Sequence, residues 1–262
     1  MQALRAAVLF IALLFLAAAD SYCTARQLKA VIVKEYPHDP TAFTQGLVWD
    51  NGVMYESTGL RGRSSLRRVN LVTGKAEQQL DLDKQFFAEG ITVFQDRIYQ
   101  LTWTSGIIFQ YDKQSFALRR SFSWPHQGWG ITHDNSSLIV SDGSATLYFL
   151  EPKTLTQERR ITVHDGGRQV RRLNELEYIN GLIYANIWKE CRIALIKPTN
   201  GAVAAWLDLT DICAKMRGGN EDVLNGIMFT PESGQLFVTG KFWSRLFAVR
   251  TEPVGLEPLK QP

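Results

Sequence analysis

The dominant pattern in this sequence is a unit of alternating apolar and polar positions that occurs five times. Each unit opens with a polar or aromatic residue, usually followed by glycine, and then by an aliphatic residue that starts a short strand-like run. The five openings are Gln45-Gly46-Leu47, Glu89-Gly90-Ile91, Trp129-Gly130-Ile131, Asn174-Glu175-Leu176 and Asn225-Gly226-Ile227. They lie 44, 40, 45 and 51 residues apart, and this near-constant period indicates a repeat architecture.

The remainder of each unit predicts three further strands. A tight turn such as Asp50-Asn51-Gly52 follows the opening run, and its residues are those that join antiparallel strands. A second strand such as 53–55 and a third such as 147–150 come next, with the alternation of a half-buried strand. A further turn, for example 198–201, leads to a fourth strand. Each unit therefore predicts one four-stranded antiparallel sheet.

The two ends of the repeat region complement each other. The last unit stops after its third strand at Arg250, whereas an additional strand, 28–33, precedes the first unit. We expect this N-terminal strand to complete the fifth sheet, because a closed ring leaves no exposed sheet edge. The sequence thus predicts an all-β, five-bladed β-propeller as a single domain over 20–262. Only the segment near 210–216 suggests a short helical turn.

Residues 1–19 have the features of a secretory signal peptide. Arg5 precedes an apolar run from Ala6 to Leu16, and three alanines follow it. The run is short for a membrane span, so we expect an exported protein, periplasmic or secreted, without a membrane anchor after cleavage. A formal net charge of +3 gives no electrostatic reason to expect nucleic-acid binding.

The cysteines and histidines are few. Of three cysteines, Cys23 lies next to the predicted cleavage region and outside a lipoprotein motif, which leaves Cys191 and Cys213. Export favours a disulfide between these two, and two free buried thiols are the alternative. The four histidines lack the spacing of a zinc site, so we expect no metal and no cofactor.

Polar and aromatic side chains are predicted to gather at one end of the ring. The start of each first strand lies beside the end of the second strand, because the two are antiparallel. The aligned starts are Gln45, Glu89, Trp129, Asn174 and Asn225, and none is aliphatic. The ends of the second strands supply Glu56, Thr58, Trp103, Asp142, Trp188, Lys241 and Trp243. A concave, aromatic cup with one central carboxylate and three carboxamides suits a small ligand.

Structural roles are the alternative for each of these residues. Polar residues at strand starts often satisfy loop backbones, and tryptophans often pack between sheets. Five aligned non-aliphatic positions weaken that explanation, because positions used only for packing should be aliphatic. Glu177 is a further candidate, since it lies one strand period beyond Glu175 and shares its face. Either glutamate could instead take part in a structural ion pair.

Several of these motifs resemble the plant and bacterial type of glutaminyl cyclase. The resemblance extends from about residue 30 to residue 250 and rests on Phe43-Thr44-Gln45-Gly46-Leu47, Glu89-Gly90-Ile91-Thr92, Ser141-Asp142-Gly143, Leu173-Asn174-Glu175-Leu176-Glu177 and Leu224-Asn225-Gly226-Ile227. It implies a five-bladed propeller that converts the N-terminal glutamine of peptides or proteins into pyroglutamate and releases ammonia without a metal. We also expect the protein to be a monomer.

The chemistry of that reaction suggests roles for the residues of the cup. Glu89 is the only carboxylate among the aligned starts, so we expect it to transfer the proton from the attacking amine to the leaving amide. The carboxamides of Gln45, Asn174 or Asn225 can stabilise the oxyanion, and the sequence leaves open which one does so. Lys241 would contact the peptide carbonyl or pair with Glu177.

Two other functions stay compatible with the pattern. A non-catalytic, secreted propeller that binds a peptide or a protein partner would need the same cup but not the carboxylate of Glu89. A sugar or lactone hydrolase usually needs a metal or a second nearby carboxylate, and neither pattern is evident in the sequence.

Overall fold

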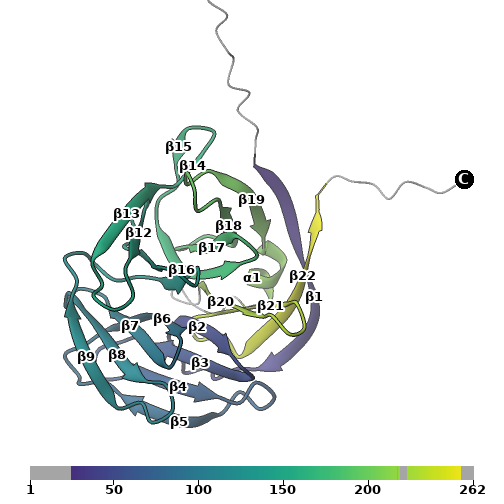
Figure 1. The fold of residues 1–262 in the computed structure, drawn as a ribbon. Coiled ribbons are helices and arrows are strands. Elements are labelled where there is room, and N and C mark those ends of the chain that lie inside the picture. The colour runs from purple at the N-terminus through teal and green to yellow at the C-terminus, as the bar shows by residue number, and fades with distance from the viewer. Residues whose placement is uncertain (1–24, 217, 219–222, 255–262) are drawn as a thin grey trace, which may run out of the picture.

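The computed structural model describes residues 25–216, 218 and 223–254, and within them the fold is all-β (Figure 1). The predicted signal peptide 1–19 and Cys23 lie outside these residues. The described part contains twenty-two strands and one short helix. The strands form one eight-stranded sheet, three four-stranded sheets and one two-stranded hairpin. Within the described residues, no helix is long and apolar enough to cross a membrane.

Three of the predicted units each form one four-stranded antiparallel sheet, with the strands in chain order. The first consists of β2 (Thr44–Asp50), β3 (Val53–Thr58), β4 (Ser65–Val69) and β5 (Ala76–Asp81). The second consists of β6 (Ala88–Phe94), β7 (Arg97–Thr102), β8 (Ile107–Asp112) and β9 (Leu118–Ser123). The third consists of β10 (Ile131–His133), β11 (Leu138–Ser141), β12 (Thr146–Leu150) and β13 (Gln157–Thr162).

The last two units are joined in the eight-stranded sheet. One half consists of β16 (Leu173–Ile179), β17 (Leu182–Ile187), β18 (Arg192–Ile196) and β19 (Val203–Asp208). The other half consists of β20 (Leu224–Thr230), β21 (Gln235–Gly240), β22 (Arg245–Pro253) and β1 (Arg26–Pro37). A hairpin of β14 (His164–Asp165) and β15 (Arg168–Gln169), which the sequence pattern did not predict, precedes β16.

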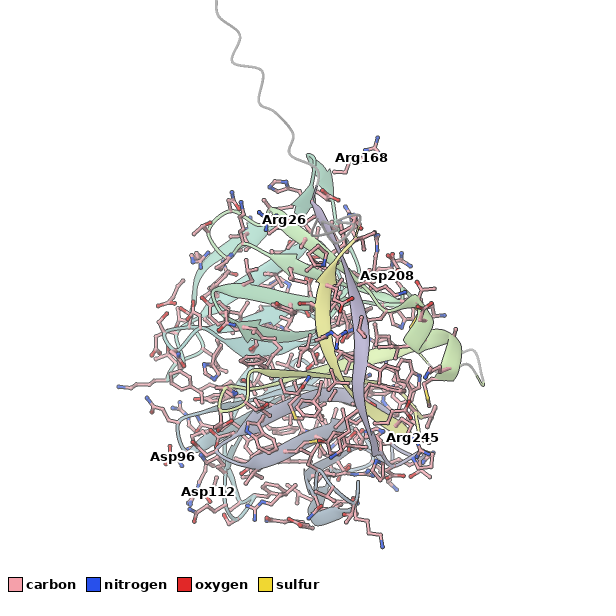
Figure 2. All side chains as sticks on the ribbon, turned by 90° about the vertical axis from the view of Figure 1, so that its right-hand side faces the viewer. Arg26, Asp96, Asp112, Arg168, Asp208 and Arg245 are labelled. Atoms are coloured by element: carbon pink, nitrogen blue, oxygen red, sulfur yellow. A yellow bond between two sulfur atoms is a disulfide. The ribbon has the colours of Figure 1, made fainter. Side chains whose placement is uncertain are left out.

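The N-terminal strand β1 pairs with β22, as predicted. The two strands are antiparallel and stay paired from Leu28 opposite Pro253 to Pro37 opposite Arg245. Figure 2 shows them side by side along one flank of the molecule, between the labelled residues Arg26 and Arg245. The first residues of β1 also pair in parallel with β19, through Arg26 opposite Ala205. This second, unpredicted pairing is what joins the two halves into one sheet.

Buried apolar side chains fill the space between every two consecutive four-stranded units. Among the described residues there are five clusters, and each takes residues from two units that are neighbours in the chain order. The fifth cluster joins the last sheet to the first, and it contains Met228, Phe237, Leu246, Leu47 and Met54. In Figure 1 the first strands β2, β6, β16 and β20 lie towards the middle, with β5, β9 and β13 at the periphery. Each sheet is therefore covered by a neighbour on both of its faces.

A disulfide and the short helix close the connection between β19 and β20. The helix α1 (Thr210–Met216) begins after Asp208, whose carboxylate accepts a hydrogen bond from the Thr210 N–H at 2.9 Å. Cys213 of this helix is disulfide-bonded to Cys191, with 6.1 Å between the two Cα atoms. The predicted disulfide and the predicted helical turn are thus both confirmed.

Deleting residues 27–33 tests the dependence of the fold on β1. The deletion exposes the edge of β22 and uncovers part of the buried cluster around Ala30, so we expect aggregation or a large fall in melting temperature. The measurements are light scattering and thermal unfolding of the purified protein. Val33→Ser is the control, because that side chain on the same strand is 53% exposed and its loss should change stability by about 0.5 kcal/mol at most. A soluble deletion variant with an unchanged melting temperature would contradict the prediction.

Candidate functional site

A cavity of about 560 Å³ opens where the first strands of the sheets begin. Its walls combine aromatic side chains with two carboxamides, one carboxylate and one ammonium group. The lining residues are Phe43, Gln45, Leu60, Phe87, Glu89, Trp103, Trp129, Asn174, Trp188, Lys241 and Phe242. This volume suits a ligand of the size of one or two amino-acid residues.

Backbone bulges turn the aligned polar residues towards the cavity. The pairing of β2 with β3 steps from Thr44 to Gly46, so that Gln45 is left without a partner. The same irregularity occurs at the starts of β6, β16 and β20, over the residue pairs 89–90, 174–175 and 225–226. A bulge re-aims a side chain that regular alternation would place on one face of the sheet. Three of these four bulges coincide with a polar residue followed by glycine, and the fourth falls on Asn174-Glu175.

Seven of the predicted site residues line this cavity together. They are Gln45, Glu89, Trp103, Trp129, Asn174, Trp188 and Lys241. Asn225 and Glu177 do not belong to the lining. Asn225 is fully buried beneath it, and Glu177 lies deeper in the molecule, hydrogen-bonded to Thr132 and to the backbone N–H of Phe229.

The carboxamides are oriented by hydrogen bonds from below the cavity. The Nδ2 group of Asn225 donates to the carbonyl oxygen of Thr44 at 2.9 Å and to Oε1 of Gln45 at 3.2 Å. The oxygen of Gln45 is thereby engaged, so its amide nitrogen is the end that a ligand can use as a donor. Oδ1 of Asn174 is buried and accepts no hydrogen bond from the described residues, which makes it an acceptor for a ligand donor.

Glu89 is a buried carboxyl group beside a buried ammonium group. Its side chain is 5% exposed, and this burial raises its pKa well above the ordinary value, while the nearby charge of Lys241 opposes the rise. Lys241 is 4% exposed, and its Nζ lies 4.5 Å from the centre of the Phe43 ring. Burial thus favours the neutral carboxyl form of Glu89, and the charge of Lys241 favours its carboxylate form.

Four lining residues were not predicted from the sequence: Phe43, Leu60, Phe87 and Phe242. The three phenylalanines form a continuous edge-to-face series with Trp103, with ring centres 5.2 Å apart for Phe43 and Phe242, 5.9 Å for Phe43 and Phe87, and 5.6 Å for Phe87 and Trp103. A signal for two of them was present, because Phe43 and Phe87 each stand two residues before an aligned polar residue. That shared offset places them on the same wall.

Gln127 is a further residue that the sequence pattern did not reveal. Its Oε1 accepts hydrogen bonds from the indole N–H of Trp103 at 2.8 Å and of Trp129 at 3.0 Å. Trp129 in turn packs edge-to-face against Trp188, with ring centres 5.7 Å apart. One carbonyl group thus fixes the orientation of two indoles in the cavity wall.

Glu56, predicted at the end of a second strand, does not line the cavity and forms a buried ion pair with His38, which also contacts the backbone of the predicted Trp243. The carboxylate of Glu56 accepts a hydrogen bond from Nε2 of His38 at 3.0 Å and one from Thr44 at 2.8 Å. Nδ1 of His38 lies 2.7 Å from the carbonyl oxygen of Trp243. Both partners are acceptors, so His38 carries both ring protons and a positive charge. The pair ties the loop after Lys241 to the start of β2.

The charges of this pair shift both pKa values. Burial lowers the pKa of His38, but the charge and hydrogen bond of Glu56, together with Trp243, outweigh it and leave that pKa raised. Burial raises the pKa of Glu56, but His38 and Arg67 outweigh it and leave that pKa lowered. Arg67 lies 3.8 Å from Glu56 and also bonds Asp39. No group of three or more His, Cys, Asp or Glu side chains that could hold a metal ion is found in the described residues.

Comparisons with known proteins give one consistent result. Residues 6–251 match the family model described as glutamine cyclotransferase. The chain is 41% identical over 224 residues to the glutaminyl-peptide cyclotransferase of Arabidopsis thaliana, covering 84% of this chain and 70% of that protein. The crystal structure of Myxococcus xanthus glutaminyl cyclase is 39% identical and superposes with a TM-score of 0.83, covering 88% of this chain and 99% of the other.

The His38–Glu56 pair predicts a specific pH dependence of stability. Because the pKa of His38 is raised in the folded state, the protonated histidine stabilises the fold. This stabilisation is fully present at pH values below 6.5, the ordinary pKa of histidine, and is lost as the pH rises through the raised pKa of the folded state. Because the pKa of Glu56 is lowered in the folded state, the ionised glutamate also stabilises the fold. This stabilisation is present at pH values above 4.5, the ordinary pKa, and is lost as the pH falls through the lowered pKa. Because His38→Gln leaves the buried Glu56 with only the more distant Arg67 as a cation, we expect a loss of about 3 kcal/mol between those values.

The measurement is chemical denaturation of the wild type and the variant over a range of pH. The difference in unfolding free energy between them should be largest between pH 4.5 and 6.5 and should shrink at alkaline pH. A difference that does not change with pH would contradict the assignment of a charged His38.

Proposed function

The chain belongs to the glutamine cyclotransferase family, and on that premise we propose how its cavity cyclises an N-terminal glutamine. It is an enzyme that acts on peptides or proteins with glutamine at the N-terminus. The α-amine attacks the γ-carboxamide carbon of the same residue, a C–N bond forms in the new lactam ring, and the C–N bond to the amide nitrogen breaks. The products are pyroglutamate and ammonia. The observation that carries the proposed mechanism is that one buried carboxyl group faces a cavity otherwise lined by amide, ammonium and apolar groups.

The first contribution of the cavity is to hold the glutamine side chain folded back on its own amine. The reaction is intramolecular, so a fixed near-attack conformation supplies a large part of the barrier reduction. The aromatic walls formed by Trp103, Trp129 and Trp188 fit this task, because apolar rings on several sides of the substrate exclude water. A tryptophan face beside the substrate's ammonium group adds cation–π attraction.

The second contribution is proton transfer by Glu89. As carboxylate it accepts the proton that the attacking amine loses, and as carboxylic acid it then gives a proton to the departing amide nitrogen. A raised pKa suits the second step, because burial favours the protonated form that donates to the amide nitrogen. Lys241 keeps the carboxylate form accessible, and its ammonium group also suits binding of the substrate's peptide carbonyl.

The carboxamides divide the recognition of the substrate between them. The amide nitrogen of Gln45 donates to the oxyanion of the tetrahedral intermediate, since its oxygen is held by Asn225. The unpaired Oδ1 of Asn174 accepts an N–H from the substrate's amine or carboxamide. Asn225 acts through Gln45 and does not touch the substrate in this proposal. Glu177 is assigned to the support beneath the cavity.

We also propose the overall architecture of the protein. The five sheets are the blades of a β-propeller, and β1 closes the ring by completing the last blade. Support comes from five apolar clusters that connect consecutive sheets and then the last sheet with the first. The domain covers 20–262, and the segment 1–19 is a signal peptide that directs export to the periplasm or the exterior. The protein acts as a monomer and without a metal.

Ammonia release is the direct test of the proposed function. Incubation of the purified wild type with glutaminyl-β-naphthylamide should release ammonia and the cyclised product in equal amounts. An excess of a metal chelator should leave the rate unchanged, because proton transfer and oxyanion binding both come from side chains. Ammonia that disappears with chelator would contradict metal independence. An absence of ammonia under every condition would favour a non-catalytic module that binds peptides or proteins.

Glu89→Gln tests the assigned proton-transfer group. The variant keeps the size of the side chain but cannot accept a proton, so kcat should fall by roughly 100-fold to 10,000-fold while KM changes little. Because burial disfavours the ionised form of Glu89, the variant should unfold at the same or a higher temperature at neutral pH. Glu177→Gln is the comparison, and a smaller loss is expected from a residue outside the cavity. Near-normal turnover of folded Glu89→Gln would remove Glu89 from the mechanism.

A further inference from the structure

One of the five aligned openings departs from the common sequence. The second position of the opening is glycine in four units, at Gly46, Gly90, Gly130 and Gly226, and it is Glu175 in the fourth unit. These positions lie at the starts of the first strands, and in Figure 1 the strands β2, β6, β16 and β20 lie towards the middle of the molecule. A carboxylate in place of a hydrogen atom therefore enters the centre of the strand arrangement.

The glycines allow the first strands to approach each other at the level of the backbone. A Cβ atom at Gly46 would lie 2.5 Å from the backbone nitrogen of Ile91, and one at Gly130 would lie 2.0 Å from the carbonyl oxygen of Asn174. No side chain fits at those distances, so β2 contacts β6 directly and β10 contacts β16 directly. At the fourth unit a side chain makes the corresponding connection.

The carboxylate of Glu175 joins three strands. Its residue is 1% exposed, and its Oε2 accepts the backbone N–H of Ile227 on β20 at 2.9 Å. Its Oε1 accepts the backbone N–H of Leu47 on β2 at 3.3 Å. Leu47 and Ile227 each stand two residues after a carboxamide of the site, and Glu175 itself directly follows the third. One side chain thus connects the backbones that present Gln45, Asn174 and Asn225.

We propose that Glu175 is the positioning residue that sets the relative placement of the carboxamides of Gln45 and Asn174, which line the cavity, and of Asn225 beneath it. It does not line the cavity, and it acts by holding β2, β16 and β20 at fixed distances. A displacement of about 1 Å in groups that bind the transition state costs on the order of 100-fold in rate, so this support affects turnover as well as stability. The inference rests on the function proposed above.

The ionised form of Glu175 is the one that fits its partners. Both carboxylate oxygens face N–H donors, and a carboxylate is an acceptor at both oxygens. Burial, and after it the charge of Glu177, leave the pKa of Glu175 raised well above its ordinary value, although the two N–H donors oppose the rise. In a Glu175→Gln variant one of the two backbone donors would face the amide NH₂ group. The substitution therefore breaks one connection with almost no change in volume.

Glu175→Gln is the first variant, and Tyr99→Phe is its matched control. Tyr99 is also buried, and it does not line the cavity. Its hydroxyl group donates a hydrogen bond to the carbonyl oxygen of Pro152 at 2.8 Å and accepts one from the side-chain amide of Gln110 at 2.7 Å. Both variants lose buried hydrogen bonds and should unfold at lower temperatures. We expect kcat for glutaminyl-β-naphthylamide to fall by roughly 10-fold to 100-fold in Glu175→Gln only, with KM changed by less than about threefold.

The kcat values of the two variants decide whether Glu175 has a positioning role. A folded Glu175→Gln variant with a kcat within twofold of the wild type would overturn it, even with a lowered melting temperature. Equal losses of kcat in both variants would also overturn it, because a general loss of packing would then be responsible. If Glu175→Gln does not fold, Glu175→Asp keeps the charge, shortens the reach by one methylene group and undergoes the same comparison. Failure of the proposed function would appear separately, as a wild type that releases no ammonia.

Discussion

The structure depends on one constraint, which is that every sheet has two apolar faces and both must be covered. Each four-stranded unit contributes side chains to two of the five buried clusters in the described residues, and the last cluster brings Met228 of the fifth unit against Leu47 of the first. Burial of apolar area is the main favourable contribution to folding, so an open end would leave a whole face in water. This closed sequence of contacts brings the starts of all first strands to one place, and the cavity lies there.

The chemistry of the cavity is determined largely by residues that do not line it. Asn225 orients Gln45 from below, Gln127 orients two indoles from the rim, and the pair of His38 and Glu56 anchors the loop that carries Lys241. These groups are positioned by hydrogen bonds between strands that are far apart in the sequence. A preorganised arrangement of this kind avoids reorganisation during the reaction.

The repeat predicted the five units, the pairing of the N-terminal strand and most of the cavity lining, because periodicity records which faces are buried. It could not predict the hairpin before β16 or the pairing of β1 with β19, which depend on contacts between distant segments. The prediction for Glu177 relied on strict alternation from Glu175, and a bulge at that point interrupts the alternation. Gln127 was missed because a loop residue carries no periodic signal.

The pairing of β1 with β22 also determines when the chain can finish folding. Synthesis produces β1 first and β22 last, with more than 200 residues between Val31 and its partner Arg250. Until the C-terminal strand is available, the edge of β1 has no antiparallel partner, and the buried face between the last sheet and the first cannot form. Contacts of such long sequence separation slow folding, because the entropy of closing the chain is lost before they form. The intermediate units can assemble in order as they are synthesised, whereas the cavity is completed only once β22 is available to pair with β1.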